Sequence, residues 1–229
     1  MKYIPSIAFE EMSGSAKGVT AAKVKSRKYI RNRGYGGNTR TEFQASVKSV
    51  FKQLSQAWKN LTNAQILAWN AAAGTAEARA VLGTKGKISG ANLFMRLNYW
   101  VVYCGGQIMT SVPTLTGVPT PEDATVVLTT AAMTFQLADI PAQHENLKLV
   151  IQASEPQGNG ISKAYSKAAA FDAPLTVTVE DIDIKAKYDA KYGAPTAGTP
   201  KVFFKYFFVN TLTGEKSGEK MVSAVLSNG

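Results

Sequence analysis

The residue types that most often perform acid–base or nucleophilic chemistry are sparse in this chain. His144 is the only histidine and Cys104 the only cysteine. A zinc site needs several His, Cys or carboxylate ligands, and a Ser-His-Asp triad would have to use His144 without a Gly-x-Ser-x-Gly elbow. We interpret His144 as a solvated loop residue and Cys104 as a small core residue. The sequence predicts no catalytic residue, no metal site, no cofactor and no enzymatic activity.

Carboxylates gather in one short stretch, at Glu180, Asp181 and Asp183, with Asp189 following. Alternating acids can bind calcium, but the twelve-residue EF-hand spacing is absent. No Walker loop or dinucleotide-binding glycine pattern is present either. We interpret the stretch as a solvated turn balanced by lysines. A calcium site and an enzyme acting on a cell-surface glycan are the alternatives.

The charge is distributed unevenly along the chain. Residues 1 to 110 hold 16 Lys+Arg against 4 Asp+Glu, and residues 111 to 229 hold 10 against 12, so +12 and −2 add to the total of +10. No acid lies between Met12 and Thr41, where the basic residues are Lys17, Lys23, Lys25, Arg27, Lys28, Arg31, Arg33 and Arg40. Such a segment is typical of contact with an anionic partner. The partner is a protein surface or the phosphates of nucleic acid; the alternative is that the charge only keeps the chain soluble.

Residues 1–38, which hold most of these cations, are predicted to form an extended arm. Glycines interrupt any helix, and the apolar residues follow neither a helical nor a strand period for long. An arm of this kind can lie across neighbouring subunits.

Residues 39–110 are predicted to form a small three-helix bundle. Thr39 and Glu42 form a capping box before a stripe of apolar residues, Phe43, Val47, Val50, Leu54, Trp58 and Leu61. Thr62 and Gln65 form a second capping box, before a short helix that ends at Gly74. Ser89 caps a third helix, whose apolar residues are Leu93, Leu97, Trp100 and Cys104. We expect Trp58 and Trp69 to share one core.

Residues 111–121 contain three prolines and are predicted to be a linker. Beyond it the apolar period changes to two, which predicts an immunoglobulin-like or fibronectin-like antiparallel β-sandwich over 122–229. The expected strands are Thr125–Thr129, Met133–Ala138, Leu147–Ala153, Ser162–Ala168, Leu175–Glu180, Val202–Val209 and Met221–Leu226, with a short helix in Asp181–Tyr192. The aromatic strand at 202–209 must be central, because an exposed edge of this kind would aggregate. The fold class is therefore α+β multidomain.

The sequence predicts a protein made in the cytoplasm and not held in a membrane. The richest apolar stretch, Leu93–Cys104, is interrupted by Arg96 and Asn98 and is shorter than the roughly 20 residues a bilayer requires. A single cysteine excludes an internal disulfide framework.

A spaced signature runs through the predicted helices. Its residues follow the pattern Q-x6-F-x2-L-x3-W-x2-L-T-x2-Q-x3-W-x3-A, at Gln44, Phe51, Leu54, Trp58, Leu61, Thr62, Gln65, Trp69 and Ala73, and then Ser89, Gly90, Phe94 and Asn98. Over about residues 12 to 121 the chain resembles structural proteins of tailed bacteriophages and prophages of Bacteroides-type hosts, including crAss-like phages.

The resemblance implies a place in the virion with no enzymatic role. The expected roles are a ring subunit at the portal or tail junction and an auxiliary capsid protein. The expected partners are portal, capsid or tail-ring subunits and further copies of the chain, with a possible contact to packaged DNA. The alternative is a nucleic-acid-binding protein whose sandwich is a partner-binding module.

Overall fold

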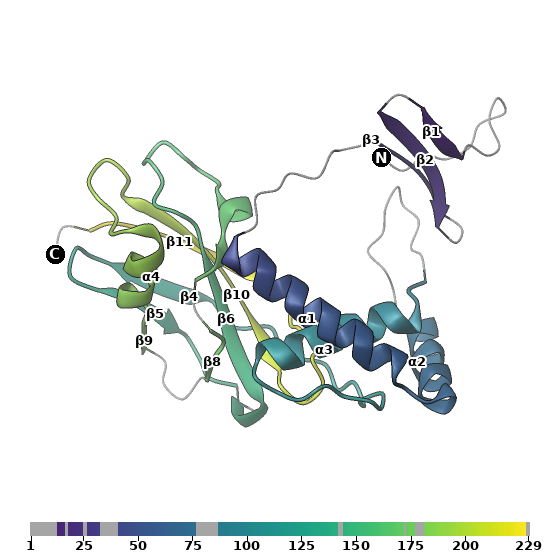
Figure 1. The fold of residues 1–229 in the computed structure, drawn as a ribbon. Helices are drawn as coiled ribbons and strands as arrows, with labels where there is room; N and C mark the ends of the chain where they lie inside the picture. Colours follow the sequence, from purple (N-terminus) through teal and green to yellow (C-terminus); the bar gives the residue numbers. More distant parts are fainter. Residues whose placement is uncertain are drawn as a thin grey trace. The chain divides into compact units, whose positions relative to one another are not determined.

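The computed structural model describes residues 13–16, 18–24, 27–32, 41–76, 87–141, 144–171, 173–176 and 181–227. The described residues form four α-helices and several antiparallel sheets (Figure 1), which confirms the α+β class. The chain divides into two compact units. Unit 1 comprises Met1–Met95 and Thr110–Val112, and unit 2 comprises Arg96–Met109 and Pro113–Gly229.

The described part of the N-terminal region is a three-stranded antiparallel sheet. Its strands are β1 (Gly14–Ala16), β2 (Val19–Val24) and β3 (Arg27–Asn32), in the order β1-β2-β3. The prediction of an extended arm over 1–38 is therefore wrong for these residues. Valine, threonine, tyrosine and isoleucine favour strands, and Gly18, with φ +88°, allows the turn between β1 and β2.

Helices α1 (Glu42–Lys59) and α2 (Asn63–Thr75) begin at threonine caps. The cap of α1 is Thr41, whose hydroxyl accepts the amide hydrogen of Gln44; the predicted cap, Thr39, lies outside the described residues. The predicted capping box of α2 is confirmed. The Thr62 hydroxyl accepts from the Gln65 amide at 3.3 Å, and the Gln65 side chain accepts from the Thr62 amide at 2.9 Å.

Helix α3 (Gly90–Tyr103) begins at Ser89, as predicted, whose hydroxyl accepts from the Asn92 amide. Phe94 contacts both Trp58 and Trp69, with ring centroids 5.4 and 5.3 Å apart, so the two tryptophans share one core as predicted. At the other end of α3, Gly105 has φ +84°, and the amides of Gly105 and Gly106 donate to the carbonyls of Val102 and Val101. This Schellman arrangement satisfies the last carbonyl groups of the helix.

Unit 2 contains two antiparallel sheets that pack face to face. One has the order β4-β5-β9, from β4 (Ala124–Leu128), β5 (Met133–Leu137) and β9 (Asp181–Asp183). The other has the order β11-β10-β6-β7, with β8 also paired to β6. Its strands are β6 (Leu147–Ala153), β7 (Ala169–Ala170), β8 (Leu175–Thr176), β10 (Lys201–Asn210) and β11 (Lys220–Val225).

Five of the predicted strands are present within one or two residues, as β4, β5, β6, β10 and β11. The strand predicted at Ser162–Ala168 is wrong, because Tyr165–Lys167 forms the 3-10 helix η2, from which the Tyr165 ring packs edge-on against Phe203. The predicted strand Leu175–Glu180 is seen as β8, and residues 177–180 lie outside the described residues. The helix predicted in Asp181–Tyr192 begins later, as α4 (Lys185–Tyr192), after β9.

Strand β10 is central, as predicted, and both of its faces are buried. On one face Phe204, Tyr206 and Phe208 join the core between the two sheets, where Phe135 of β5 contacts the first two rings. On the other face Phe207 and Val209 pack with Val150 and Cys104, and Trp100 contacts Phe207 at 5.3 Å. The second half of α3 therefore covers a sheet of unit 2.

The division between the units differs from the predicted linker at 111–121. It falls within α3, whose residues from Arg96 onward belong to unit 2 because they pack on β10. Thr110–Val112 belong to unit 1, where the Trp69 indole nitrogen donates to the Thr110 carbonyl at 3.0 Å. Within unit 2, the Glu215 carboxylate accepts from the amides of Thr116 and Gly117 at 3.2 and 3.3 Å. The proline-rich segment is thus held by Glu215 within unit 2, and the Trp69 indole holds the residue that precedes it within unit 1.

Candidate partner interface

The structure gathers part of the predicted basic segment onto the N-terminal sheet. Lys23 lies in β2, and Arg27, Lys28 and Arg31 lie in β3. The other predicted contact residues, Lys17, Lys25, Arg33 and Arg40, lie outside the described residues. The candidate interface is therefore the sheet β1–β3, which we call the basic sheet.

The register of the basic sheet decides which side chains share a face. Thr20 pairs with Arg31 and with Ser15, and Ala22 pairs with Tyr29. Because side chains alternate along a strand and directly paired residues share a face, Tyr29 and Arg31 lie on one face with the two hydroxyl groups. Those hydroxyls lie 2.9 Å apart, which is a hydrogen-bond distance. The opposite face presents Lys28 beside Ile30, with Lys23 directly across from Lys28.

The described residues of the basic sheet form no buried core. None of its described side chains is buried: Arg31 and Lys23 are exposed, Tyr29 and Lys28 are partly exposed, and Val19 keeps 43% of its surface. A small sheet becomes stable when it buries an apolar face or packs against another element. The described residues of the basic sheet therefore show no fully buried apolar face, and a partner that covers the sheet would add to its stability.

The chemistry that the basic sheet offers is anion binding. Arginine and lysine can form charge-assisted hydrogen bonds with carboxylates or phosphates, and no acid lies between Met12 and Thr41 in the sequence. The hydroxyls of Ser15 and Thr20 add neutral donors beside Arg31. The positions of these hydroxyls depend on the strand register, so the sequence alone did not indicate them.

Cys104 is buried at the end of α3. Burial raises the pKa of its thiol to about 11, while the Lys148 ammonium lowers it in part. Lys148 also donates to the Cys104 carbonyl oxygen at 2.8 Å. Because the thiolate is the reactive form, Cys104 is a weak nucleophile, in agreement with its interpretation as a core residue. His144 begins the 3-10 helix η1 (His144–Asn146).

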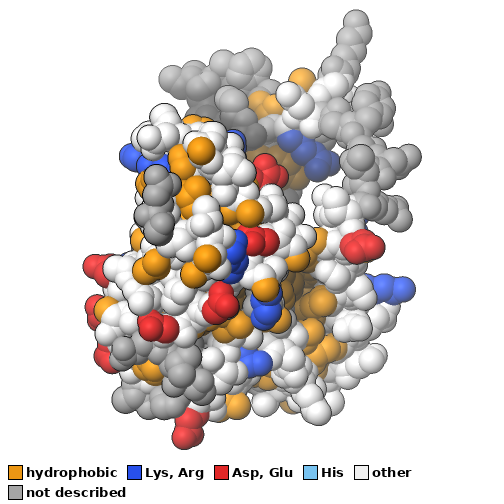
Figure 2. Space-filling view, turned by 90° about the vertical axis from the view of Figure 1, so that its left-hand side faces the viewer, with side chains coloured by type: hydrophobic (Ala, Val, Ile, Leu, Met, Phe, Trp, Pro, Cys, Tyr) orange, Lys and Arg blue, Asp and Glu red, His pale blue; other side chains and the backbone are white. Residues whose placement is uncertain are grey.

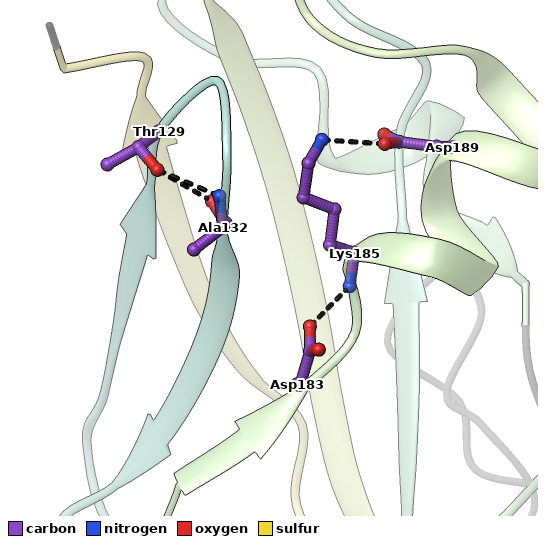
Figure 3. Close-up of polar contacts among 5 residues, drawn as sticks. All are labelled: Thr129, Ala132, Asp183, Lys185 and Asp189. Carbon is purple, nitrogen blue, oxygen red and sulfur yellow. Dashed lines mark hydrogen bonds and ion pairs between the residues drawn. The ribbon is translucent and has the colours of Figure 1, made fainter. Parts of the chain in front are cut away.

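The carboxylate stretch is engaged in local structure (Figure 3). The Asp183 carboxylate accepts from the backbone amide of Lys185 at 2.9 Å, at the start of α4. The Lys185 ammonium pairs with Asp189 at 2.6 Å, one helical turn further along. In the part of the chain that the structure describes, no group of three His, Cys, Asp or Glu could hold a metal ion, and Glu180 lies outside that part.

A hollow of about 360 Å³ in unit 2 was not indicated by the sequence. Its lining includes Arg96, Trp100, Leu115, Glu215 and Lys216. Lys216 pairs with Glu219 and lies 3.8 Å from the centre of the Phe207 ring, while Glu215 binds the amides of the proline-rich segment. Lys216 and Glu215 already have partners, so we interpret the hollow as a junction between structural elements.

Unlike the basic sheet, the surface drawn in Figure 2 has acidic and basic side chains interspersed. Among the described residues, no helix is both long and apolar enough to cross a bilayer. The chain matches no protein-family model, and no curated protein or solved structure shows significant similarity to it.

Proposed function

We propose that this chain is a non-enzymatic structural subunit of a tailed-phage virion that docks on neighbouring subunits through the basic sheet. The observation that carries the proposal is a sheet with exposed cations and, among its described residues, no buried side chain, in a chain whose helices and sandwich sheets do bury apolar residues. A segment of this kind gains stability when a partner covers it. The resemblance of residues 12 to 121 to phage structural proteins supports the same role.

Within a particle, the subunit is a ring component at the portal or tail junction, or an auxiliary capsid protein. Its partners are portal, capsid or tail-ring subunits, and copies of the chain form a homo-oligomer. The helices of unit 1 act as a bundle that anchors the basic sheet. The paired sheets of unit 2 act as an immunoglobulin-like module.

Deletion of residues 1–38 tests this function. The truncated chain should keep its helical circular dichroism signal and its melting temperature, because unit 2 and helices α1 to α3 retain their cores. It should be absent from particles purified by density gradient, whereas the full chain is incorporated. A truncated chain that enters particles at the full-length level would show that the basic sheet is not the docking element.

A second candidate function is nucleic-acid binding, which is favoured by Tyr29 and Arg31 on one face of the sheet. An aromatic ring can stack on a base while arginine contacts phosphate. Eight phosphate contacts would give a slope of about −7 for log K against log salt concentration. Gel shifts with a 20-nucleotide single strand and a duplex across a salt series measure this slope. A slope near zero would exclude this function.

A further inference from the structure

A surface turn of unit 2, beyond the end of β6, places an asparagine directly before a glycine. Gly158, Asn159, Gly160 and Ile161 form a β-turn, in which the Ile161 amide donates to the Gly158 carbonyl at 3.1 Å. Asn159 and Gly160 are its two central residues, and both are exposed. Asparagine and glycine are both favoured in turns. The pair is therefore accessible to a reaction that needs only the two residues and water.

The side chain of an asparagine can react with the backbone of the residue that follows it. The Gly160 amide nitrogen loses its proton and attacks Cγ of Asn159, which closes a succinimide ring, and the side-chain nitrogen leaves as ammonia. Water then opens the ring at one of its two carbonyl groups. Opening at one carbonyl gives aspartate. Opening at the other gives isoaspartate, in which the main chain runs through the former side chain. The net reaction is hydrolysis of a carboxamide to a carboxylate and ammonia.

The local structure meets the requirements of this reaction. The attacking nitrogen must be available, and among the described residues no oxygen accepts a hydrogen bond from the Gly160 amide. The Asn159 carboxamide likewise has no hydrogen-bond partner in the described part of the chain. Glycine has no side chain to hinder the approach, and beyond its chain neighbours no atom lies within 4 Å of the Cβ position of Gly160.

Two other asparagines of unit 2 show what prevents the reaction elsewhere. The Oδ1 atom of Asn210 accepts two backbone amides of its own turn, at 2.8 and 3.2 Å, and the amide of the next residue, Thr211, is itself hydrogen-bonded. Asn98 is fully buried, and its Oδ1 atom accepts from the Met109 amide at 2.6 Å. The sequence holds one further Asn-Gly pair, Asn228-Gly229, which lies outside the described residues.

We propose that Asn159 is a site of spontaneous deamidation, at which the folded protein acquires aspartate and isoaspartate without an enzyme. The inference does not depend on the proposed function. Each event replaces a neutral carboxamide with a carboxylate, so the surface of unit 2 gains one negative charge at this turn. Isoaspartate also lengthens the main chain between the Gly158 carbonyl and the Ile161 amide, which disrupts their hydrogen bond. The fraction of modified turns therefore rises with the age of the protein.

The modification lies next to the start of β10 but outside the core. Gln157, the residue before the turn, exchanges two backbone hydrogen bonds with Lys201, the first residue of β10, at 2.8 and 3.0 Å. These bonds do not involve Asn159 or Gly160. We therefore expect the modified protein to keep its fold, with faster hydrogen exchange at the Ile161 amide.

The experiment follows the full-length folded protein over several weeks at 37 °C and pH 7.4. Trypsin cleaves after Lys148 and Lys163 and releases the peptide Leu149–Lys163, in which Asn159 is the only asparagine. The second Asn-Gly pair falls in a separate peptide, Met221–Gly229. Liquid chromatography with mass spectrometry separates and quantifies the asparagine, aspartate and isoaspartate forms of each peptide. A sample digested before the incubation measures the amount formed during handling.

Two glycine-to-alanine variants form a matched pair. Gly160→Ala keeps Asn159 and places a methyl group beside the attacking nitrogen. The space there is open and the backbone of Gly160 is not left-handed, so this variant should fold normally. Gly158→Ala makes the same change on the other side of Asn159, where the nearest atom to the new Cβ, the Gly198 carbonyl oxygen, lies at 3.9 Å. Circular dichroism and melting temperature confirm that both variants are folded.

Deamidation of Leu149–Lys163 should be at least about tenfold faster in the wild-type chain and in Gly158→Ala than in Gly160→Ala, because the Cβ atom of alanine hinders the attack. Isoaspartate should accompany aspartate in the product. Equal rates in the wild-type chain and Gly160→Ala would overturn the proposal, and so would an equally slow rate in Gly158→Ala. Formation of aspartate alone would also overturn it, because direct hydrolysis of the side chain gives no isoaspartate.

A comparison with the unfolded chain tests whether the folded turn permits the reaction. The same peptide is quantified after incubation of the protein in guanidinium chloride at the same pH. Deamidation at a comparable rate in the folded and unfolded protein supports the proposal. Deamidation in the unfolded protein alone would overturn it, because the turn would then hold the Gly160 nitrogen away from Asn159.

Discussion

The hydroxyl of Tyr206 on β10 accepts a hydrogen bond from the backbone amide of Ala124, at the start of β4, at 2.8 Å. The same hydroxyl donates to the Glu122 carbonyl at 3.0 Å. Residues more than 80 positions apart in the chain are thus joined between the two sheets of unit 2. Burial raises the pKa of Tyr206, so the hydroxyl remains protonated and able to donate across the ordinary pH range.

Tyr206→Phe should lower the free energy of unfolding by about 1–3 kcal/mol, because it leaves the buried amide of Ala124 without its acceptor. Urea unfolding followed by tryptophan fluorescence measures the change. Tyr165→Phe is the control, since the Tyr165 hydroxyl has no hydrogen bond recorded within the described residues and its ring would still pack on Phe203. A Tyr206→Phe variant as stable as the control would show that the two hydrogen bonds contribute nothing net.

Gly214→Ala should destabilise unit 2 strongly. Gly214 has φ +70°, and a Cβ atom there would lie 2.0 Å from the backbone oxygen of Leu97. The backbone conformation alone costs about 1–3 kcal/mol for a residue other than glycine, and the clash adds to that cost. Gly198→Ala is the control, because nothing lies within 4 Å of its Cβ position. Thermal unfolding should give a clearly lower melting temperature for Gly214→Ala, and equal melting temperatures would contradict the described approach of the two segments.

Thr62→Ala should lower the free energy of unfolding of unit 1 by about 1 kcal/mol, because it removes the side-chain half of the capping box of α2. Thr62→Ser should restore it. Thr75→Ala serves as the control at the other end of the same helix, where the hydroxyl donates to the Ala72 carbonyl and caps no amide. Urea titrations by circular dichroism would refute the prediction if Thr62→Ala and Thr75→Ala gave the same midpoint.

Cys104 should react slowly with thiol reagents in the folded protein. Because burial raises its pKa from 9.0 to about 11, the thiolate fraction at pH 8 falls about 100-fold. The rate of reaction with a disulfide reagent, measured folded and in urea, should differ by at least that factor. Equal rates would show that the thiol is accessible and ionises normally.

The same shift predicts an effect of alkaline pH on stability. The unfolded thiol ionises near pH 9 and the folded thiol near pH 11, so the folded state holds the proton more tightly between these values. Stability should therefore fall as pH rises through this window, since the unfolded state binds fewer protons there. Cys104→Val removes the titrating group and should make the fall less steep. An unchanged slope in Cys104→Val would assign the effect to the buried tyrosines instead.

Five strands of unit 2, β4, β5, β6, β10 and β11, were predictable because their apolar residues alternate or fill both faces. Strand β10 is the clearest case, since its aromatic content required a central position and the structure places it between β11 and β6. The aromatic residues of β10 also indicated that both faces of this strand are buried. A strand that is apolar on both faces must pack against another element on each face. On the second face of β10 that element is the C-terminal part of α3 with Trp100, together with Cys104 directly after the helix.

The basic sheet was not predictable from hydrophobic period, because it buries no face. Its strands hold small and charged residues on both sides, so no alternation marks them. Its cations could be grouped from the sequence only by the absence of acids around them. Which of them share a face with Tyr29 depends on the register, and register depends on turns such as the one at Gly18.

The position of β10 along the chain has a consequence for biosynthesis. Both Trp100 and β6 precede it in sequence, so they leave the ribosome earlier. The aromatic strand β10 is the most aggregation-prone segment of the chain. When it emerges, β6, which pairs with one of its edges, and Trp100, which packs on its second face, have already been synthesised. Only β11 is still to come, and it follows ten residues after β10 ends. Translation order thus limits how long this aromatic stretch is open to other nascent chains.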